Sequence, residues 1–146
     1  MSSEFERDIE DNRSALSEAR ADLLAVVRAL SDDDLDRARR GGWRVRKVLE
    51  HLVQSEWLYA RLVQHLRGPA VQGDIVSGAP ASVQDAEDRL SASRAALLAA
   101  VEGVDEESFY RLSAVGHEEY SILSVLENAA NHDREHAEQV RGILSF

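Results

Sequence analysis

Three histidines have the residue type and spacing that metal chemistry requires: His51, His132 and His136. His132 and His136 are four residues apart, which places two side chains on one face of an α-helix, on adjacent turns. His51 lies far away in the sequence, in a segment that also has a helical pattern. Two imidazoles from one helix and one from another can hold a divalent metal ion and leave one coordination position open, as catalytic metal sites do.

These histidines are predicted to face the interior of a helical protein, or nearly so. With 3.6 residues per turn, His132 and His136 fall within the apolar stripe of their helix, and His51 falls at the edge of its own. A single inward histidine is more often a core residue with a hydrogen-bonded ring. Burying several imidazoles without partners is costly, so three of them among the five in the chain favour a metal site. His65 and His117 are predicted to lie on the surface.

Polar residues near these histidines are candidates for supporting roles. Glu135 is predicted at the flank of the site, where it can serve as a catalytic proton-transfer group or stay solvated. Ser55 and Asn128 lie one helical turn from His51 and His132 and are predicted to line a cofactor pocket, to orient the rings, or only to fill small gaps. The string from His132 to His136 also matches the H-x-x-E-H motif of inverzincin proteases. That resemblance implies a much larger α/β domain, which does not fit a helical chain of this length.

The elements that must position the histidines are predicted from apolar residues at helical spacing. No segment shows sustained two-residue alternation, so no β-strand is expected. Residues 68–81 are rich in Gly and Pro and predict a long loop. Because such a loop can cross the length of a bundle, the helices on either side need not be antiparallel neighbours. The predicted helices are about Phe5–Leu30, Val45–Leu66, Val83–Val104 and Ile122–Leu144.

Length and composition narrow the class of protein. A chain of 146 residues, 44% hydrophobic and 30% charged, fits one soluble globular domain spanning residues 1–146. The net charge of −10 argues against a nucleic-acid partner, which would favour clustered positive charge. No apolar run approaches the roughly 20 residues of a membrane span, and no signal peptide is visible. We therefore expect a cytoplasmic protein that acts on a small molecule, without nucleic acid or membrane partners.

The segment from Trp43 to Leu52, WRVRKVLEHL, resembles the opening of the second helix in the DinB-like superfamily, and His132-x-x-x-His136 resembles its second signature. The resemblance covers nearly the whole chain in order and spacing. It implies an all-α fold, a four-helix bundle of up-down-down-up topology. It also implies a divalent metal ion, Zn²⁺ or Ni²⁺, on His51, His132 and His136, and a homodimer. Trp57, predicted on the outer side of its helix, is a candidate dimer contact.

The superfamily includes DNA-damage-inducible DinB proteins, YfiT-like metal-dependent hydrolases, and mycothiol- and bacillithiol-dependent enzymes. The expected function is a metal-dependent transferase that joins a low-molecular-weight thiol to a small electrophile. Because the chain has no cysteine, that thiol must come from a cofactor such as mycothiol or bacillithiol. One alternative is a hydrolase that uses a metal-bound water, whose pKa can fall to about 7. The other is a non-catalytic metal-binding or stress-response bundle.

Overall fold

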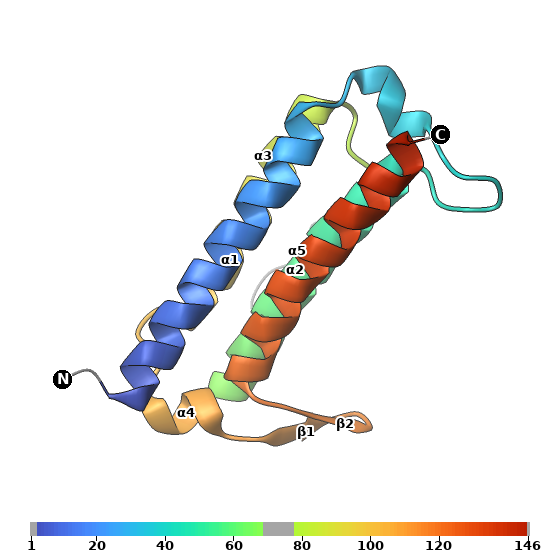
Figure 1. Cartoon of the computed structure of the whole chain (residues 1–146). Helices are drawn as coiled ribbons and strands as arrows, with labels where there is room; N and C mark the ends of the chain where they lie inside the picture. Colours follow the sequence, from blue (N-terminus) through green and yellow to red (C-terminus); the bar gives the residue numbers. More distant parts are fainter. Residues whose placement is uncertain (1–2, 69–77, 146) are drawn as a thin grey trace.

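Four long helices lie side by side along most of the molecule (Figure 1). Helices α1 (Glu4–Arg28) and α5 (Ile122–Leu144) run in one direction, and α2 (Val45–Arg67) and α3 (Val83–Val101) run in the other. The predicted four-helix bundle of up-down-down-up topology is therefore confirmed. Each end of a long helix lies within three residues of its predicted position.

The structure, a computed structural model, describes residues 3–68 and 78–145. Most of the predicted 68–81 loop lies outside the described residues, but the helices that it joins, α2 and α3, run in the same direction as expected (Figure 1). Among the described helices, none has the length and apolar character that crossing a membrane would require.

Short elements close the two ends of the bundle (Figure 1). The 3₁₀-helix η1 (Asp32–Asp36) follows α1, and helix α4 (Glu106–Tyr110) follows α3. Strands β1 (Ser113–Val115) and β2 (Glu118–Tyr120) then form an antiparallel hairpin, so the prediction of no β-strand is wrong. Strands of three residues are too short to show an alternating pattern in the sequence. Gly116, with φ of 66°, supplies the left-handed backbone that the tight turn between them needs.

A serine fixes the start of α5, the helix that carries two of the histidines. The Ser121 hydroxyl accepts a hydrogen bond from the Ser124 backbone N–H at 3.1 Å, and the Ser124 hydroxyl accepts one from the Ser121 N–H at 2.9 Å. This reciprocal pair satisfies backbone donors that the first helical turn leaves free. The register of α5 is thereby defined from its first residue, ten residues before His132.

The buried apolar side chains form two clusters, one toward each end of the bundle. The first includes Leu23, Val48, Leu90 and Val140, and the second includes Leu16, Val63, Leu97 and Val125. Each cluster contains residues from all four long helices, so the apolar stripe of every helix is buried in the bundle. Buried polar and charged side chains lie between the two clusters along each long helix: Arg20, Glu56, Ser93 and Asp133.

Trp57 does not lie on the outer side of α2, so that prediction is wrong. Its side chain is half-buried and packs against the first apolar cluster, and its indole Nε1 is buried without a hydrogen-bond partner. Helix α2 packs against both α3 and α5. It therefore buries a wider arc than the single apolar stripe predicts.

Candidate metal centre

The three predicted histidines meet where α2 packs against α5. The Nε2 atom of His132 lies 3.1 Å from Nε2 of His51 and 2.8 Å from Nε2 of His136. One ring nitrogen from each residue lies within 4.8 Å of the other two. All three side chains are half-buried, so they border the interior and still reach solvent. Side chains 81 residues apart in sequence are thus brought to one point by the packing of two helices.

The surroundings of the rings favour their neutral form. Burial, together with the neighbouring His136 and His51, lowers the pKa of His132 to about 4. Burial, followed by the charges of His136 and Lys47, also lowers the pKa of His51. A neutral imidazole has a nitrogen lone pair available, which is the form that binds a metal ion. At neutral pH, His51 and His132 therefore need not lose a proton before they bind a metal ion.

Gln139 orients one of the rings. Its Oε1 lies 2.6 Å from Nδ1 of His136. When Nδ1 carries the proton and donates it to this oxygen, Nε2 is left as a free acceptor facing the other two histidines. Supports of this kind are typical of histidines that ligate metals. Gln139 was not among the predicted residues, although its position three residues after His136 on one helix face is a usable signal.

The residue types and distances fit a divalent metal ion. Three imidazole nitrogens within 4.8 Å of one another match the donor set of open, three-ligand zinc sites. Two of these rings are biased toward the neutral state, and the third is fixed by Gln139.

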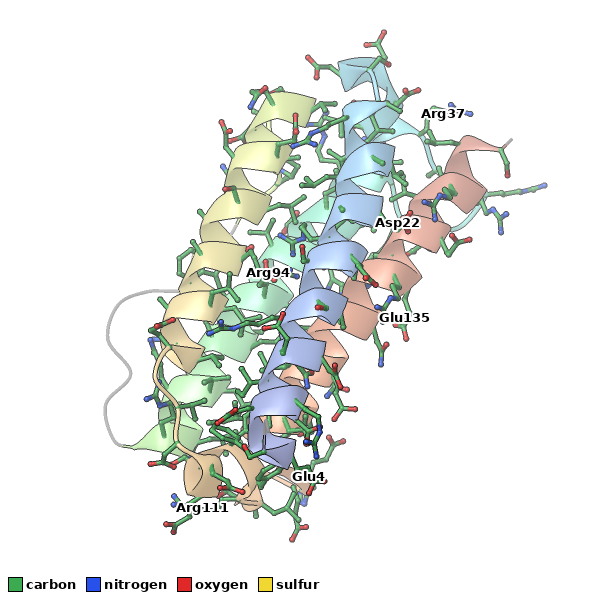
Figure 2. All side chains as sticks on the ribbon, turned by 60° about the vertical axis from the view of Figure 1, so that its left-hand side comes forward. Glu4, Asp22, Arg37, Arg94, Arg111 and Glu135 are labelled. Atoms are coloured by element: carbon green, nitrogen blue, oxygen red, sulfur yellow. The ribbon has the colours of Figure 1, made fainter. Side chains whose placement is uncertain are left out.

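The other predicted site residues have separate positions. Glu135 is exposed on the outer surface of α5 (Figure 2), and its charge helps to raise the pKa of Tyr59, after the larger effect of burial. Ser55 is half-buried on α2, one turn after His51. Asn128 is exposed, so its predicted inward orientation is wrong: it lies at the edge of the α5 face that Ala129 buries. Neither Ser55 nor Asn128 is among the described hydrogen-bond partners of the histidines. The predicted surface positions of His65 and His117 are confirmed.

Aromatic side chains border the centre on two sides. The Trp43 ring lies 5.3 Å from that of His51, edge to face, just before α2 begins. The Tyr59 ring lies 6.0 Å from that of His132, further along α2. The Tyr59 side chain is half-buried, and burial raises the pKa of its phenol, which therefore stays protonated at neutral pH.

A network of four charged side chains, one from each long helix, lies behind the histidines. Arg20 donates from Nε to Asp133 at 2.9 Å and from its NH2 nitrogen to Glu56 at 2.8 Å. Arg94 donates from Nε to Glu56 at 2.7 Å and from its NH2 nitrogen to Asp133 at 2.8 Å. The Ser93 hydroxyl adds a 2.6 Å bond to Glu56. Two guanidinium groups and two carboxylates balance one another, so this buried layer carries no net charge.

On the same two helices, the charged residues are more deeply buried than the histidines. Asp133 is the residue next to His132, and Glu56 lies five residues after His51. When Asp133 points to the two arginines, the rotation of α5 places His132 and His136 toward α2. None of the four charged residues was predicted, although Arg20 lies between Leu16 and Leu23 in an apolar stripe, where a charge is unusual.

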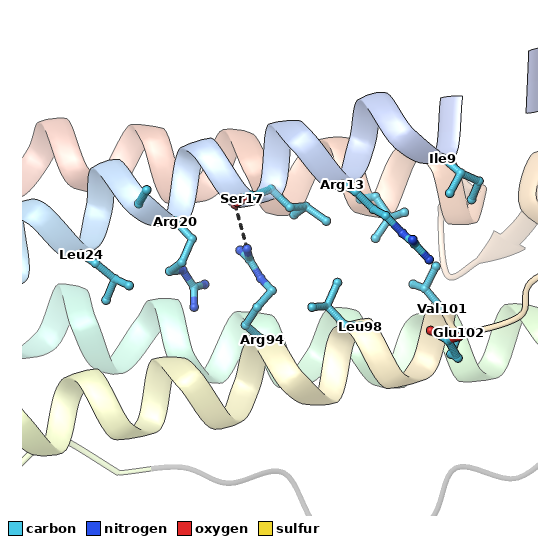
Figure 3. Close-up of a pocket in the computed structure, with 12 residues that line it drawn as sticks. Ile9, Arg13, Ser17, Arg20, Leu24, Arg94, Leu98, Val101 and Glu102 are labelled. Carbon is cyan, nitrogen blue, oxygen red and sulfur yellow. Dashed lines mark hydrogen bonds between the residues drawn. The ribbon is translucent and has the colours of Figure 1, made fainter. Parts of the chain in front are cut away.

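A separate cavity of about 730 Å³ opens between α1 and α3 (Figure 3), whereas the histidines lie on α2 and α5. Arg20 and Arg94 form part of its wall, and Arg94 also donates to the backbone carbonyl of Leu16 at 2.9 Å. The rest of the wall is mostly apolar, with Leu16, Leu24 and Leu98 among its residues. Figure 2 shows the Arg94 side chain directed from α3 toward the interior of the bundle.

The fold and this site define a class: a four-helix bundle with three histidines converging between two of its helices. The family model of the DinB superfamily matches residues 15–140, and the chain belongs to this superfamily. The predicted resemblance is therefore confirmed at the level of the family.

Two solved structures are similar to this chain. TT2238, described as a four-helix bundle protein, has a TM-score of 0.70 and 25% identity, covering 90% of this chain and 96% of its own. A DinB-like protein from Bacillus cereus ATCC 10987 has a TM-score of 0.76 and 16% identity, covering 94% of this chain and 91% of its own. No curated protein matches this chain in sequence.

Removing one charge from the buried layer should cost much more stability than removing one from the surface. In Asp133→Asn, both arginines lose a carboxylate partner whose side chain is only 4% exposed. We expect the free energy of unfolding to fall by about 3–5 kcal/mol, as for other broken buried pairs. The matched control, Asp22→Asn, breaks an exposed pair with Arg141 and should cost less than about 1 kcal/mol. Urea titration followed by circular dichroism measures both, and equal losses would contradict the role of the layer.

The metal-free protein should become more stable as pH rises from about 4 to 6.5. The folded state holds the pKa of His132 at about 4, against an ordinary value of 6.5. In this window the unfolded chain binds more protons, so the free energy of unfolding increases with pH. We expect His132→Ala to weaken this dependence, while His65→Ala, at an exposed position, leaves it unchanged. Urea titrations at several pH values test this, and identical slopes for the two variants would show that His132 does not contribute.

Proposed function

We propose that this protein binds a divalent metal ion, Zn²⁺ or Ni²⁺, through His51, His132 and His136. We further propose that it is a transferase, which joins a low-molecular-weight thiol such as mycothiol or bacillithiol to a small electrophile. The observation that supports the metal site is the convergence of three ring nitrogens from two helices, with Nε2 to Nε2 distances of 2.8 and 3.1 Å. The thiol reaction rests on the chemistry of that donor set and on the superfamily.

The donor set suits the activation of a thiol. A divalent ion held by three neutral imidazoles keeps its full positive charge and favours the thiolate form of a coordinating thiol, which is the nucleophilic form. The chain itself contains no cysteine, so the nucleophile must be a separate molecule. The histidines are half-buried, so such a molecule can approach them from solvent.

Three further residues are assigned supporting roles in this proposal. Ser55 lies on the same face of α2 as His51, one turn further on, and its hydroxyl can contact a bound cofactor. Asn128 lies one turn before His132 on α5 and is exposed to solvent, where its amide can bind the polar part of the thiol. Glu135 is also exposed, and it is the candidate group for proton transfer.

A metal-dependent hydrolase is the second candidate. The charge of Glu135 acts on Tyr59, whose ring lies 6.0 Å from that of His132, so a carboxylate is present near the centre. A carboxylate in such a position can serve as a general base for the attack of water.

Metal titration and an activity screen test these proposals in order. Zn²⁺ and Ni²⁺ are titrated into untagged protein by calorimetry, and we expect one ion per chain. His132→Ala should lower the affinity by at least about 10-fold, the loss typical of altered metal sites, and retain most of the helical circular dichroism signal. The exposed His65→Ala is the control and should bind as the wild type does.

The loaded protein is then mixed with several low-molecular-weight thiols and electrophiles, and separately with ester substrates. Thiol-dependent product formation that His132→Ala abolishes supports the transferase. Turnover of esters without thiol supports the hydrolase instead. Metal binding with neither activity identifies a non-catalytic metal-binding or stress-response protein, and no metal binding rejects the centre itself.

We also propose that the protein works in the cytoplasm, where thiols are kept reduced, and that it forms a homodimer as the superfamily resemblance implies. Exposed apolar side chains on two helices that pack together, Leu58 on α2 and Leu98 on α3, offer surface for such contact. Sedimentation at micromolar concentration should give about twice the chain mass of 16.2 kDa. A single species at the chain mass would reject the dimer.

A further inference from the structure

Trp43, at the rim of the three-histidine centre, is an aromatic residue that does not belong to the hydrophobic core. Trp43 is 44% exposed, although its ring contacts that of His51 at 5.3 Å. Exposing a large indole to water forgoes the free energy that burial would supply. The Trp43 ring lies beside His51, one of the proposed metal ligands, and much of the ring surface is exposed to solvent. It is therefore placed where a molecule bound at the centre would touch it.

A positive charge lies next to this ring. The Lys47 ammonium is 5.8 Å from the centre of the Trp43 ring, and its charge contributes to the lowered pKa of His51. Lys47 pairs with Glu50 at 3.5 Å, but the Lys47 side chain is 50% exposed. Exposed pairs of this kind are weak, so the ammonium remains available to a second anion.

Lys47 belongs to a segment that is rich in basic residues. Residues 37–47 contain six basic residues and no acidic one, in a chain with a net charge of −10. Arg44 and Arg46 share Asp36, and Arg37 pairs with Asp34 at 3.3 Å. Lys47 is the basic residue whose contacts place it beside the centre, since it lies near the Trp43 ring and acts on His51. A positive charge in this position attracts anions. The basic residues are Arg37, Arg39, Arg40, Arg44, Arg46 and Lys47.

We propose that the three-histidine centre selects small molecules that carry a negative charge next to an aromatic or other planar group. Trp43 contacts the planar group and Lys47 contacts the charge. A planar group gains attraction from an indole face or edge beyond simple burial, which a saturated group of similar size does not. This inference rests on the proposed metal site, because the bound molecule must reach the open coordination position.

Calorimetry with three matched probes tests the selection on the zinc-loaded protein. Benzoate is planar and anionic, cyclohexanecarboxylate is anionic but not planar, and benzamide is planar but neutral. We expect benzoate to bind about 3- to 10-fold more tightly than cyclohexanecarboxylate, the range of one aromatic contact. Benzoate should also bind more tightly than benzamide.

Variants at the two residues separate the contributions. Trp43→Leu should remove the preference for benzoate over cyclohexanecarboxylate, and Trp43→Phe should keep most of it. Lys47→Gln should weaken benzoate about 2- to 5-fold and leave benzamide unchanged, whereas Lys47→Arg should behave as the wild type. The controls are Leu112→Ala, at an exposed apolar residue at the other end of the bundle, and Arg28→Gln, at an exposed cation paired with Glu87. Neither should change any of the three affinities.

Zinc stoichiometry is measured first for every protein, which separates the two levels of the proposal. If wild-type protein does not bind zinc, the proposed function and this inference both fail. If zinc binds normally but the benzoate preference survives Trp43→Leu, or Lys47→Gln affects benzoate and benzamide alike, only this inference fails. A Trp43→Leu variant that loses zinc would show that the indole supports His51 instead of contacting a ligand, and would also overturn it.

Discussion

The buried pairing of Arg20 and Arg94 with Glu56 and Asp133 is the constraint on which the rest of this structure depends. A charge removed from water is costly unless an opposite charge and well-directed hydrogen bonds compensate it. Here each of the four long helices supplies one member, with contacts of 2.7–2.9 Å. Apolar clusters on either side can tolerate small slides of one helix against another, because contacts between apolar side chains are non-directional. The charged layer cannot tolerate such slides, because its hydrogen bonds are directional. It therefore fixes the position of each long helix along the bundle axis and its rotation about its own axis.

This constraint explains why a site can form on the outer side of the layer. Both carboxylates come from α2 and α5, which are also the helices that carry the histidines. With Glu56 and Asp133 buried between the helices, His51 on α2 meets His132 and His136 on α5 where the two helices pack together. Neither arginine-bearing helix supplies a candidate ligand. The three-histidine cluster is thus formed by the same pair of helices that supplies both carboxylates, at half-buried positions that solvent can reach.

The surroundings of the centre combine neutral rings with a neighbouring basic residue, Lys47, and the two properties are compatible. Burial and mutual proximity keep the pKa values of His51 and His132 low, so these rings can accept a cation. The basic residues lie outside, in the segment before α2 and in its first turn, where solvent weakens their repulsion of a metal ion. An ion held by neutral ligands keeps its charge and requires an anionic or polarised partner. In the function proposed above, Lys47 attracts such partners to the centre and the Trp43 ring adds a preference for planar ones.

The sequence by itself determined the helices, because apolar periodicity and flanking signals are local properties. It also determined the candidate ligands, since the spacing of His132 and His136 guarantees a shared face wherever the helix packs. It did not determine the β1–β2 hairpin, whose strands are too short for a pattern, or the burial of Trp57, which follows from α2 having two packing partners. Only the tertiary structure decided which charges pair across the core, because Arg20 and Asp133 are 113 residues apart and nothing in the sequence links them. It alone brought His51 to His132, since that contact depends on how α2 and α5 are rotated about their axes, and it alone left Trp43 exposed beside His51. The contact of Gln139 with His136 lies within one helix, so its spacing was already present in the sequence.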